Sequence, residues 1–307
     1  MNVKFQRSCK LVVGLDPDTA GDYPEITVAP ELTVDFHVRR DMMASAQEAT
    51  FRVYNLNQQT RDKIFKDRNT FSRDASGKAV LRRLRFYAGY GAFQPLIFDG
   101  YVRSATSYRD KTDFITEIEG YDGGMDMAYG FTTMVDTAPS ISRKDAIKLL
   151  SRDLPGISGE PVIGEFPAAT DTQRGRVYVG NTWELLRTYT DDKGFIDNGR
   201  LIVLQDNEAI EGEVPVISAA SGLLGSPRRG ENRMEVPMLF EPRFTLGQVV
   251  SLQSETWDAV NRTYRVAGFV HKGTISPAVA GDCRTDVLLY GPAQFLIVAG
   301  KQVIPTT

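Results

Sequence analysis

The chain has 307 residues, enough to bury a sizeable core and to form two or three domains. Its hydrophobic share of 42% and charged share of 24% are those of an ordinary folded protein, which excludes global disorder. The formal net charge of −3, from 36 basic and 39 acidic residues, argues against a general nucleic-acid binder, because such proteins are usually basic.

The chain carries no pattern for membrane insertion or export. No segment approaches the ~20 consecutive apolar residues that a membrane-spanning helix needs. Residues 1–10 include Lys4, Arg7 and Lys10, but no apolar stretch of useful length follows them. We therefore predict no signal peptide and no membrane anchor, and we expect the protein to stay in the cytoplasm or to be assembled there.

Residues 1–135 are predicted to be mainly β. Lys10–Leu15 is a short apolar run, and apolar residues at 32, 34, 36 and 38 alternate with polar ones, as in a half-buried strand. Further strands are predicted at 84–90, 96–104 and 114–121. Glycines inside these strands favour a curled sheet, and hence a small barrel.

One short helix is predicted inside this first region. The strand before it ends at Asn55-Leu56-Asn57, where an asparagine side chain can accept a backbone N–H and cap a helix. The amphipathic pattern predicts that helix over residues 58–66, with Ile64 and Phe65 turned inward.

Residues 136–212 are predicted to form a small α/β module. The segment before it, 125–137, has no clear hydrophobic periodicity and is predicted to be a linker. One helix is expected to begin at Ser142 and another at Asn181, since both residues can serve as N-caps. The pair Asn198-Gly199 between two short strands is a strong hairpin signal.

Residues 213–307 are predicted to return to β structure. Glycine, proline and asparagine turns separate five expected strands, at 214–218, 233–240, 248–253, 263–271 and 286–290. The fold class is therefore β-rich α+β.

Histidine and cysteine are scarce. His37 lies at a polar position of an alternating strand and His271 ends one, so both are expected at the surface or at a strand edge. Cys9 and Cys283 are too few for a disulfide scaffold or a zinc site, and we expect both to be buried free thiols.

No motif assigns a catalytic, cofactor-binding or metal-binding residue. The acidic candidates lie near turns, where they can be solvated: Asp191, Asp192, Glu211 and Glu213. Two arginine clusters lack the interleaved aromatic residues of a nucleic-acid site. We expect their charges to be solvated or to lie at an interface: Arg82-Arg83-Arg85 and Arg228-Arg229-Arg233. Gly222–Pro227 is predicted to be a turn, because no helix follows it to receive a phosphate.

The order of several segments resembles that of hub proteins in bacteriophage baseplates and tail tips. The Asn55-Leu56-Asn57 junction comes first. A Gly-Leu-Leu-Gly-Ser-Pro turn at 222–227 follows downstream, then a Phe240-Glu241-Pro242 corner that departs slightly from the family pattern. The strand ending in Val270-His271-Lys272-Gly273 also looks like the family's next strand.

The resemblance implies two tube-like β-barrel domains, 1–135 and 213–307, flanking the α/β module at 136–212. It implies a homotrimer whose three chains form a pseudo-sixfold ring joining the tail tube protein to the central spike protein. Tape-measure and baseplate wedge proteins would be further partners. The protein would reside in the virion tail after assembly in the host cytoplasm, and it would not be an enzyme.

Three alternatives stay open at this point. One is another tail component with a related barrel, such as a tube initiator or a wedge protein. Another is a cell-wall-degrading tail enzyme, since a glycosidase needs only two carboxyl groups. The third is an unrelated binding module.

Overall fold

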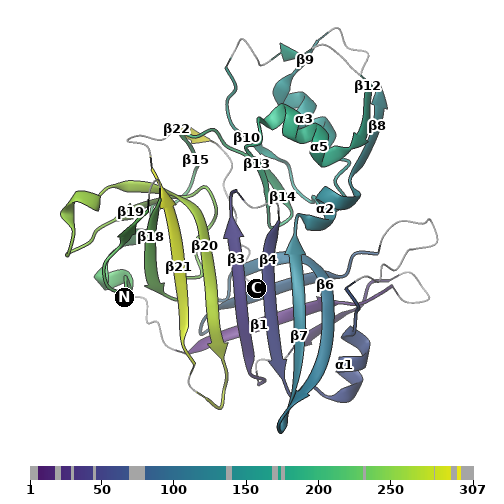
Figure 1. The fold of residues 1–307 in the computed structure, drawn as a ribbon, viewed down its shortest axis with the longest axis vertical. Coiled ribbons are helices and arrows are strands. Elements are labelled where there is room, and N and C mark those ends of the chain that lie inside the picture. Colours follow the sequence, from purple (N-terminus) through teal and green to yellow (C-terminus); the bar gives the residue numbers. More distant parts are fainter. Residues whose placement is uncertain are drawn as a thin grey trace.

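The computed structural model describes residues 6–17, 22–28, 31–43, 46–68, 80–135, 140–167, 172–173, 177–230, 233–279, 281–291 and 296–298. Within them the protein consists of one large sheet with an α/β module at one end (Figure 1). The large sheet contains β1 (Arg7–Gly14), β2 (Glu25–Val28), β3 (Val34–Asp41), β4 (Gln47–Tyr54), β5 (Arg83–Tyr90), β6 (Leu96–Asp110), β7 (Asp113–Asp122), β16 (Val216–Ile217), β17 (Arg228–Arg229), β18 (Met234–Leu239), β19 (Val249–Leu252), β20 (Thr263–Ile275) and β21 (Cys283–Tyr290).

The sheet joins the first and last thirds of the chain. Its neighbouring strands follow the order β17-β18-β21-β20-β3-β4-β7-β6-β5-β1-β2, with β19 and β16 attached beside β20. The joining ladder is antiparallel and runs from the pair Val34–Ile275 to the pair Asp41–Gly268. In Figure 1, β20 and β21 accordingly lie beside β3 and β4.

The prediction of a β-rich fold is confirmed. Strand β3 buries alternate side chains, Val34, Phe36 and Val38, as the sequence alternation predicts, because successive side chains of a strand point to opposite faces. Among the described residues the strands form an open ladder, so the two closed barrels stay a prediction.

Aromatic rings fill the core between the two layers of the first region. Figure 1 shows β1 crossing behind β3 and β4. Between these layers the Phe86 ring centroid lies 4.7 Å from that of Phe51 and 5.2 Å from that of Phe36. Phe240, which comes from the last third of the chain, adds a ring 5.7 Å from Phe36. Burying each such side chain contributes roughly 1.5–3 kcal/mol, so the last third helps to stabilise the core of the first.

The Asn-Leu-Asn junction has two distinct functions. Asn57 is the N-cap of α1 (Gln58–Ile64), and its side chain accepts the Thr60 N–H at 2.8 Å, which confirms the predicted cap. Asn55 has a positive φ of 57° and extends the pairing with β7 through its side chain. Its Oδ1 accepts the Phe114 N–H at 3.0 Å and its own N–H donates to the Phe114 carbonyl at 2.7 Å.

The helix ends earlier than predicted, and this reverses one expected side chain. Ile64 is fully buried, as expected. Phe65 was expected to turn inward, but this prediction is wrong, since its side chain is 50% exposed. The cause is the backbone, because Phe65 is the C-cap with an extended ψ of 133°, which carries its side chain off the helix face.

The α/β module is built on two capped helices. Ser142 caps α3 (Arg143–Ser151) by accepting the Asp145 N–H, and Asn181 caps α5 (Thr182–Thr190) by accepting the Glu184 N–H, so both predicted caps are confirmed. The remaining elements of the module and its flank are β9 (Ile141–Ser142), β10 (Val162–Ile163), β11 (Thr172–Gln173), β12 (Val177–Asn181), β13 (Gly194–Asp197), β14 (Arg200–Val203), β15 (Glu208–Ile210) and β22 (Leu296–Val298).

The predicted linker at 125–137 is wrong for its described part. Residues 124–129 form α2 (Gly124–Tyr129), and residues 131–135 form β8 (Phe131–Val135), which pairs antiparallel with β12. Both elements are short, and α2 buries only Asp126, so no apolar period marks them in the sequence. Residues 136–139 lie outside the described residues.

The β13–β14 hairpin lies between two hydrophobic cores. Phe195 and Ile202 belong to the core of the last third of the chain, whereas Ile196 and Leu201 belong to the core of the module. Its turn is the predicted Asn198-Gly199, with φ values of 51° and 67° that suit an Asn-Gly hairpin turn. The hairpin is thus anchored on both faces, and its turn projects toward the large sheet.

Candidate functional site

The two histidines differ in their surroundings. His37 is exposed on β3, as predicted. The surface position expected for His271 is wrong, since the side chain is 1% exposed within β20, which continues four residues further than predicted. Its Nδ1 lies 2.8 Å from the Thr285 hydroxyl oxygen. Burial, and then the charge of Arg40, lower the pKa of His271 to about 3, so the ring is neutral at ordinary pH.

The predictions for the cysteines are confirmed, and both Cys9 and Cys283 are buried free thiols in the same core. Burial is the main cause that raises the pKa of each thiol, to about 12 for Cys9. Both side chains are therefore protonated and chemically unreactive at neutral pH.

The first arginine cluster is structural. Arg82 was expected to be solvated or at an interface, but it is 8% exposed, pairs with Asp16 and donates to the Phe65 carbonyl at 3.0 Å. Its neighbours form ion pairs that are partly exposed: Arg83 with Asp99 at 2.6 Å and Arg85 with Glu25 at 2.5 Å.

The other sequence candidates also have structural roles or are solvated. Arg228 and Arg229 are exposed on β17, and Arg233 lies 3.6 Å from Asp41. Asp191 and Asp192 form ion pairs with Arg143 and Arg187 at the end of α5, while Glu211 and Glu213 are exposed. Gly222–Pro227 is a turn, as predicted, and the two-residue strand β17 follows it.

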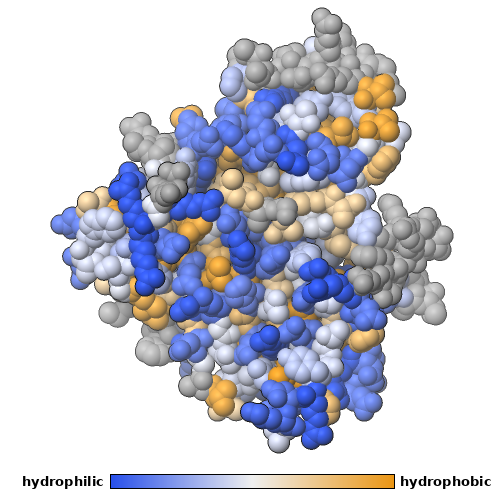
Figure 2. Space-filling model, viewed as in Figure 1, coloured by the Kyte–Doolittle hydropathy of each residue, from blue (hydrophilic) through white to orange (hydrophobic). Residues whose placement is uncertain are grey.

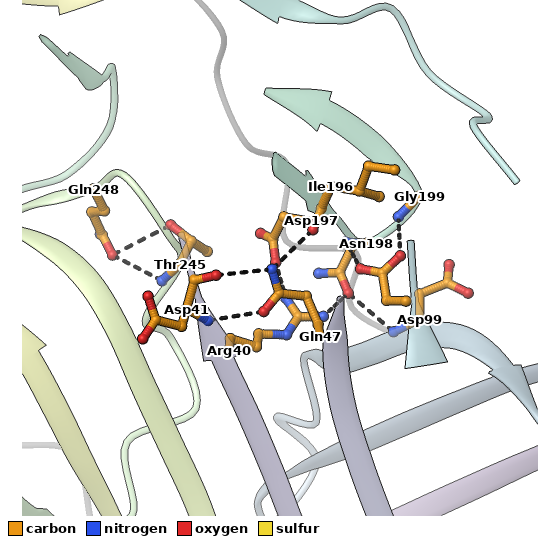
Figure 3. A network of polar contacts seen from close by, with 11 residues as sticks. Arg40, Asp41, Gln47, Asp99, Ile196, Asp197, Asn198, Gly199, Thr245 and Gln248 are labelled. Carbon is orange, nitrogen blue, oxygen red and sulfur yellow. Dashed lines mark hydrogen bonds and ion pairs between the residues drawn. The ribbon is translucent and has the colours of Figure 1, made fainter. Parts of the chain in front are cut away.

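The feature that unites distant segments is a buried polar junction beneath the β13–β14 hairpin (Figure 3). Arg40, at the end of β3, donates through Nη1 to Asp197 Oδ1 at 2.7 Å, and both side chains are 2% exposed or less. The second guanidinium nitrogen donates to the side-chain oxygen of Asn198. That oxygen also accepts the backbone N–H of Asp99 at 3.0 Å. The hairpin turn is therefore fixed to β3 and β6 together.

Asp122, the last residue of β7, is the hydrogen-bond acceptor for the hairpin turn. Its carboxyl oxygens accept the backbone N–H of Asn198 at 2.5 Å and that of Gly199 at 3.2 Å. The side chain is 1% exposed. Burial is the main cause that raises the pKa of Asp122, and Asp197 adds to it, whereas Arg40 and the two N–H groups lower it; the result is about 8.

Gln47 closes the junction on the side of β4. It is 1% exposed, and its amide nitrogen donates to the backbone oxygens of Asp41 at 3.2 Å and Ile196 at 3.1 Å. Its oxygen accepts the Asp41 N–H at 2.8 Å. Figure 3 shows these contacts meeting the ends of β3 and β4 beneath the hairpin. Because every bond has a fixed geometry, the junction specifies how the module is oriented on the sheet.

A second buried carboxyl lies at the same corner. Asp126 of α2 is 1% exposed and accepts the Gly156 N–H through Oδ1, whereas Oδ2 has no hydrogen-bond partner among the described residues. Burial raises the pKa of Asp126 to about 6. No group of three or more His, Cys, Asp and Glu side chains in the described part of the chain is placed to hold a metal ion.

Sequence reasoning missed this junction. Asp122 was assigned no role, and Asn198-Gly199 was interpreted only as a hairpin signal. Asp197 and Gln47 carry no motif at all. The one available signal was an acidic residue at a strand end before two glycines, and it does not reveal which distant backbone groups the carboxyl binds.

The outward face of the large sheet is polar and carries a groove of about 840 Å³. Side chains from β3, β4, β20 and β21 line the groove, including His37, Lys272 and Arg284. Lys272 pairs with Asp286 at 2.7 Å, and Arg284 lies 3.5 Å from the same carboxylate. Figure 2 shows the mixed polar character of this face. Such paired, hydrated charges suit a wall facing water.

An exposed apolar patch covers the β8–β12 ladder of the module. Phe131, Val177 and Val179 are 59–65% exposed there. Figure 2 shows the corresponding hydrophobic colour over these two strands. Helices long and apolar enough to cross a membrane were not found in the described ranges.

A family profile described as "Baseplate hub gp41" matches residues 11–271. No curated protein matches significantly in sequence.

Solved structures share the fold at low identity. A tail protein from Neisseria meningitidis MC58 aligns with a TM-score of 0.54 at 10% identity, over 93% of this chain and 96% of that one. The 43 kDa tail protein of prophage MuSo2 from Shewanella oneidensis gives the same TM-score and identity, over 94% and 100%. An E. coli component of the type VI secretion system, similar in structure to T4 tail proteins gp27 and gp5, aligns with a TM-score of 0.52 at 8% identity, over 90% and 77%. At these identities the likeness shows the fold, and the profile match over most of the sequence shows that the chain belongs to the baseplate hub gp41 family of structural phage tail proteins.

Proposed function

We propose that the protein is a baseplate or tail-tip hub that assembles as a homotrimer and joins the tail tube to the central spike. One observation carries this proposal. A single chain holds two β regions, each around its own core, on one sheet joined through β3 and β20. Three copies would supply six such regions, so a threefold ring would match a sixfold tube on one side and a trimeric spike on the other.

The three cores support a division into two tube-like domains, 1–135 and 213–307, around the module at 136–212. The first core draws mainly on β1 and β3 to β7, and the second mainly on β18 to β21. The second core also receives Phe195 and Ile202 from the module. In this proposal the module is packed into the second domain, and its orientation is fixed by the polar junction.

The polar outward face of the sheet is our candidate for the channel wall. It continues across β7, β4, β3, β20 and β21, and its charges are largely paired, as with Arg52 and Glu117 at 2.7 Å. A wall of this kind would stay hydrated and would hold no cargo tightly. The role of the hub would then be mechanical, with no catalytic residue and no cofactor.

The proposed partners are the tail tube protein, the central spike protein, and the tape-measure and baseplate wedge proteins. The likeness to a type VI secretion component that is itself similar to tail proteins gp27 and gp5 supports a partner set of this kind. The ring would assemble in the host cytoplasm and reside in the virion tail. Its affinity would come from large buried interfaces rather than from single residues.

The deciding experiment measures the mass of the full chain in solution, alone and mixed with a candidate spike protein. We expect about three times the chain mass of 34.1 kDa, and a larger complex when the spike protein is added. A monomer at high concentration that binds neither tube nor spike protein would contradict the proposal. Turnover of purified peptidoglycan, abolished by one Asp or Glu substitution, would support the enzyme alternative instead.

A further inference from the structure

Three charged side chains, the junction triad, are buried together beneath the hairpin turn: Arg40, Asp122 and Asp197 are 1–2% exposed. Arg40 and Asp197 form a direct pair at 2.7 Å. Asp122 is the second carboxyl group facing that one guanidinium, and Asp197 repels its charge. With both carboxylates ionised, the triad would carry a net negative charge in a site closed to water, which is strongly unfavourable.

The groups around the triad do not balance this charge. Titratable groups on the elements packed against it include Asp41 on β3, Asp99 and Tyr101 on β6, Asp126 on α2 and His271 on β20. Arg83 pairs with Asp99 at 2.6 Å, and Arg233 lies 3.6 Å from Asp41, so these cations are engaged by other carboxylates. His271 is neutral. The triad is therefore one positive charge short unless it binds a proton.

We propose that the Asp122 carboxyl binds one proton when it accepts the N–H groups of Asn198 and Gly199, which is the seated state of the turn. The turn is therefore held more tightly in mildly acidic than in mildly alkaline solution. The proton binds the Asp122 carboxyl, which leaves Arg40 and Asp197 as a neutral pair. When the turn lifts, water reaches the carboxyl and the proton returns to solvent. The proposal concerns one chain and is independent of hub assembly.

The direction of the pH dependence follows from the two states of Asp122. Seated, its pKa is raised from 3.8 to about 8; lifted into water, the carboxyl returns to its ordinary range. Between these values the seated state holds a proton that the lifted state lacks. The equilibrium constant for lifting therefore rises about tenfold per pH unit in this window and levels off above it.

The test is amide hydrogen exchange of Asn198 and Gly199 in the full chain between pH 5 and pH 8. Each rate is divided by that of an unprotected peptide at the same pH. We expect protection to fall about tenfold per pH unit in the native protein. Asp122→Asn removes the titrating group and should show a flat profile. Asp197→Asn removes one of the charges that raise the pKa of Asp122, so the fall in protection should end at a lower pH than in the native protein.

Two references make the result decisive. Asp126→Asn changes a buried carboxyl of the same corner that binds Gly156 rather than the hairpin turn, so the slope should survive. The Phe51 amide in β4 reports global unfolding and should exchange more slowly than the turn. A flat native profile, a slope that persists in Asp122→Asn, or equal rates at the turn and at Phe51 would each overturn the proposal. If Asp122→Asn fails to fold, Asp197→Asn still tests the proposal, because a profile unchanged from that of the native protein would contradict it.

Discussion

At the scale of single residues, the protein uses buried carboxyl groups as backbone acceptors at the corner where the sheet meets the module. Asp122 receives the N–H groups of Asn198 and Gly199, and Asp126 receives that of Gly156. Hydrogen bonds of this kind are directional, but a buried carboxyl carries a desolvation cost when it is ionised. The corner therefore gains a defined geometry rather than maximal stability.

Asp126 gives a residue-scale prediction with a defined sign. Because burial raises its pKa from 3.8 to about 6, the native state binds the proton more tightly than the unfolded state. Its contribution to the free energy of unfolding is complete only well below pH 3.8 and is lost as the pH rises from there to about 6. Asp126→Asn should therefore be more favourable at pH 8 than at pH 4 by about 2 kcal/mol, measured by urea denaturation at both values. An equal effect at the two pH values would contradict this assignment.

At the scale of elements, the Asn-Leu-Asn junction shows how two similar side chains can perform different tasks. Asn57 caps α1, whereas Asn55 continues the ladder with β7 where its own backbone turns away. The first task can be predicted from the sequence, because capping is local. The second depends on Phe114, which is distant in sequence, and so needed the structure.

Replacing the cap should weaken α1 without disturbing the core. Asn57 is exposed, so Asn57→Ala removes its bond to the Thr60 N–H and little else. We expect a loss of about 1 kcal/mol in the free energy of unfolding, measured by chemical denaturation. Gln59→Ala, at an exposed position in the first turn of the same helix, is the matched control and should cost nothing. Equal losses for the two variants would mean that the cap contributes nothing.

At the scale of the whole molecule, the shared sheet couples the first and last thirds of the chain. Phe240 is fully buried against Phe36 and accepts, through its carbonyl, the Tyr90 hydroxyl at 2.8 Å. Residues of the proposed second domain thus complete the core of the first. The two regions should behave as one cooperative unit rather than as independent domains.

This coupling predicts a large effect from one substitution in the last third. Phe240→Ala should lower the free energy of unfolding by about 3–5 kcal/mol and shift a single calorimetric transition as a whole. Leu239→Ala, one residue earlier and 39% exposed, should cost far less. Two separate transitions in the Phe240 variant, with only one displaced, would show that the regions unfold independently.

The sequence predicted most features that depend on neighbouring residues. The strand alternation at Phe36, the caps at Ser142 and Asn181, and the Asn198-Gly199 turn were all found where expected. Features that depend on distant partners were missed. His271 is buried because β20 has a neighbouring strand on each side, β3 and β21. Asp122 accepts backbone N–H groups because a hairpin from the module lies over it.

The ladder between β3 and β20 also constrains when the protein can finish folding. Val34 pairs with Ile275, so β3 has no partner on that edge until residues 268–275 have left the ribosome. Until then the emerging first third presents an unpaired strand edge and an incomplete core, a state prone to wrong pairing with other chains. The hairpin β20–β21 would end that exposure in one late step. Synthesis of the last third would then set the time at which a subunit becomes competent to assemble.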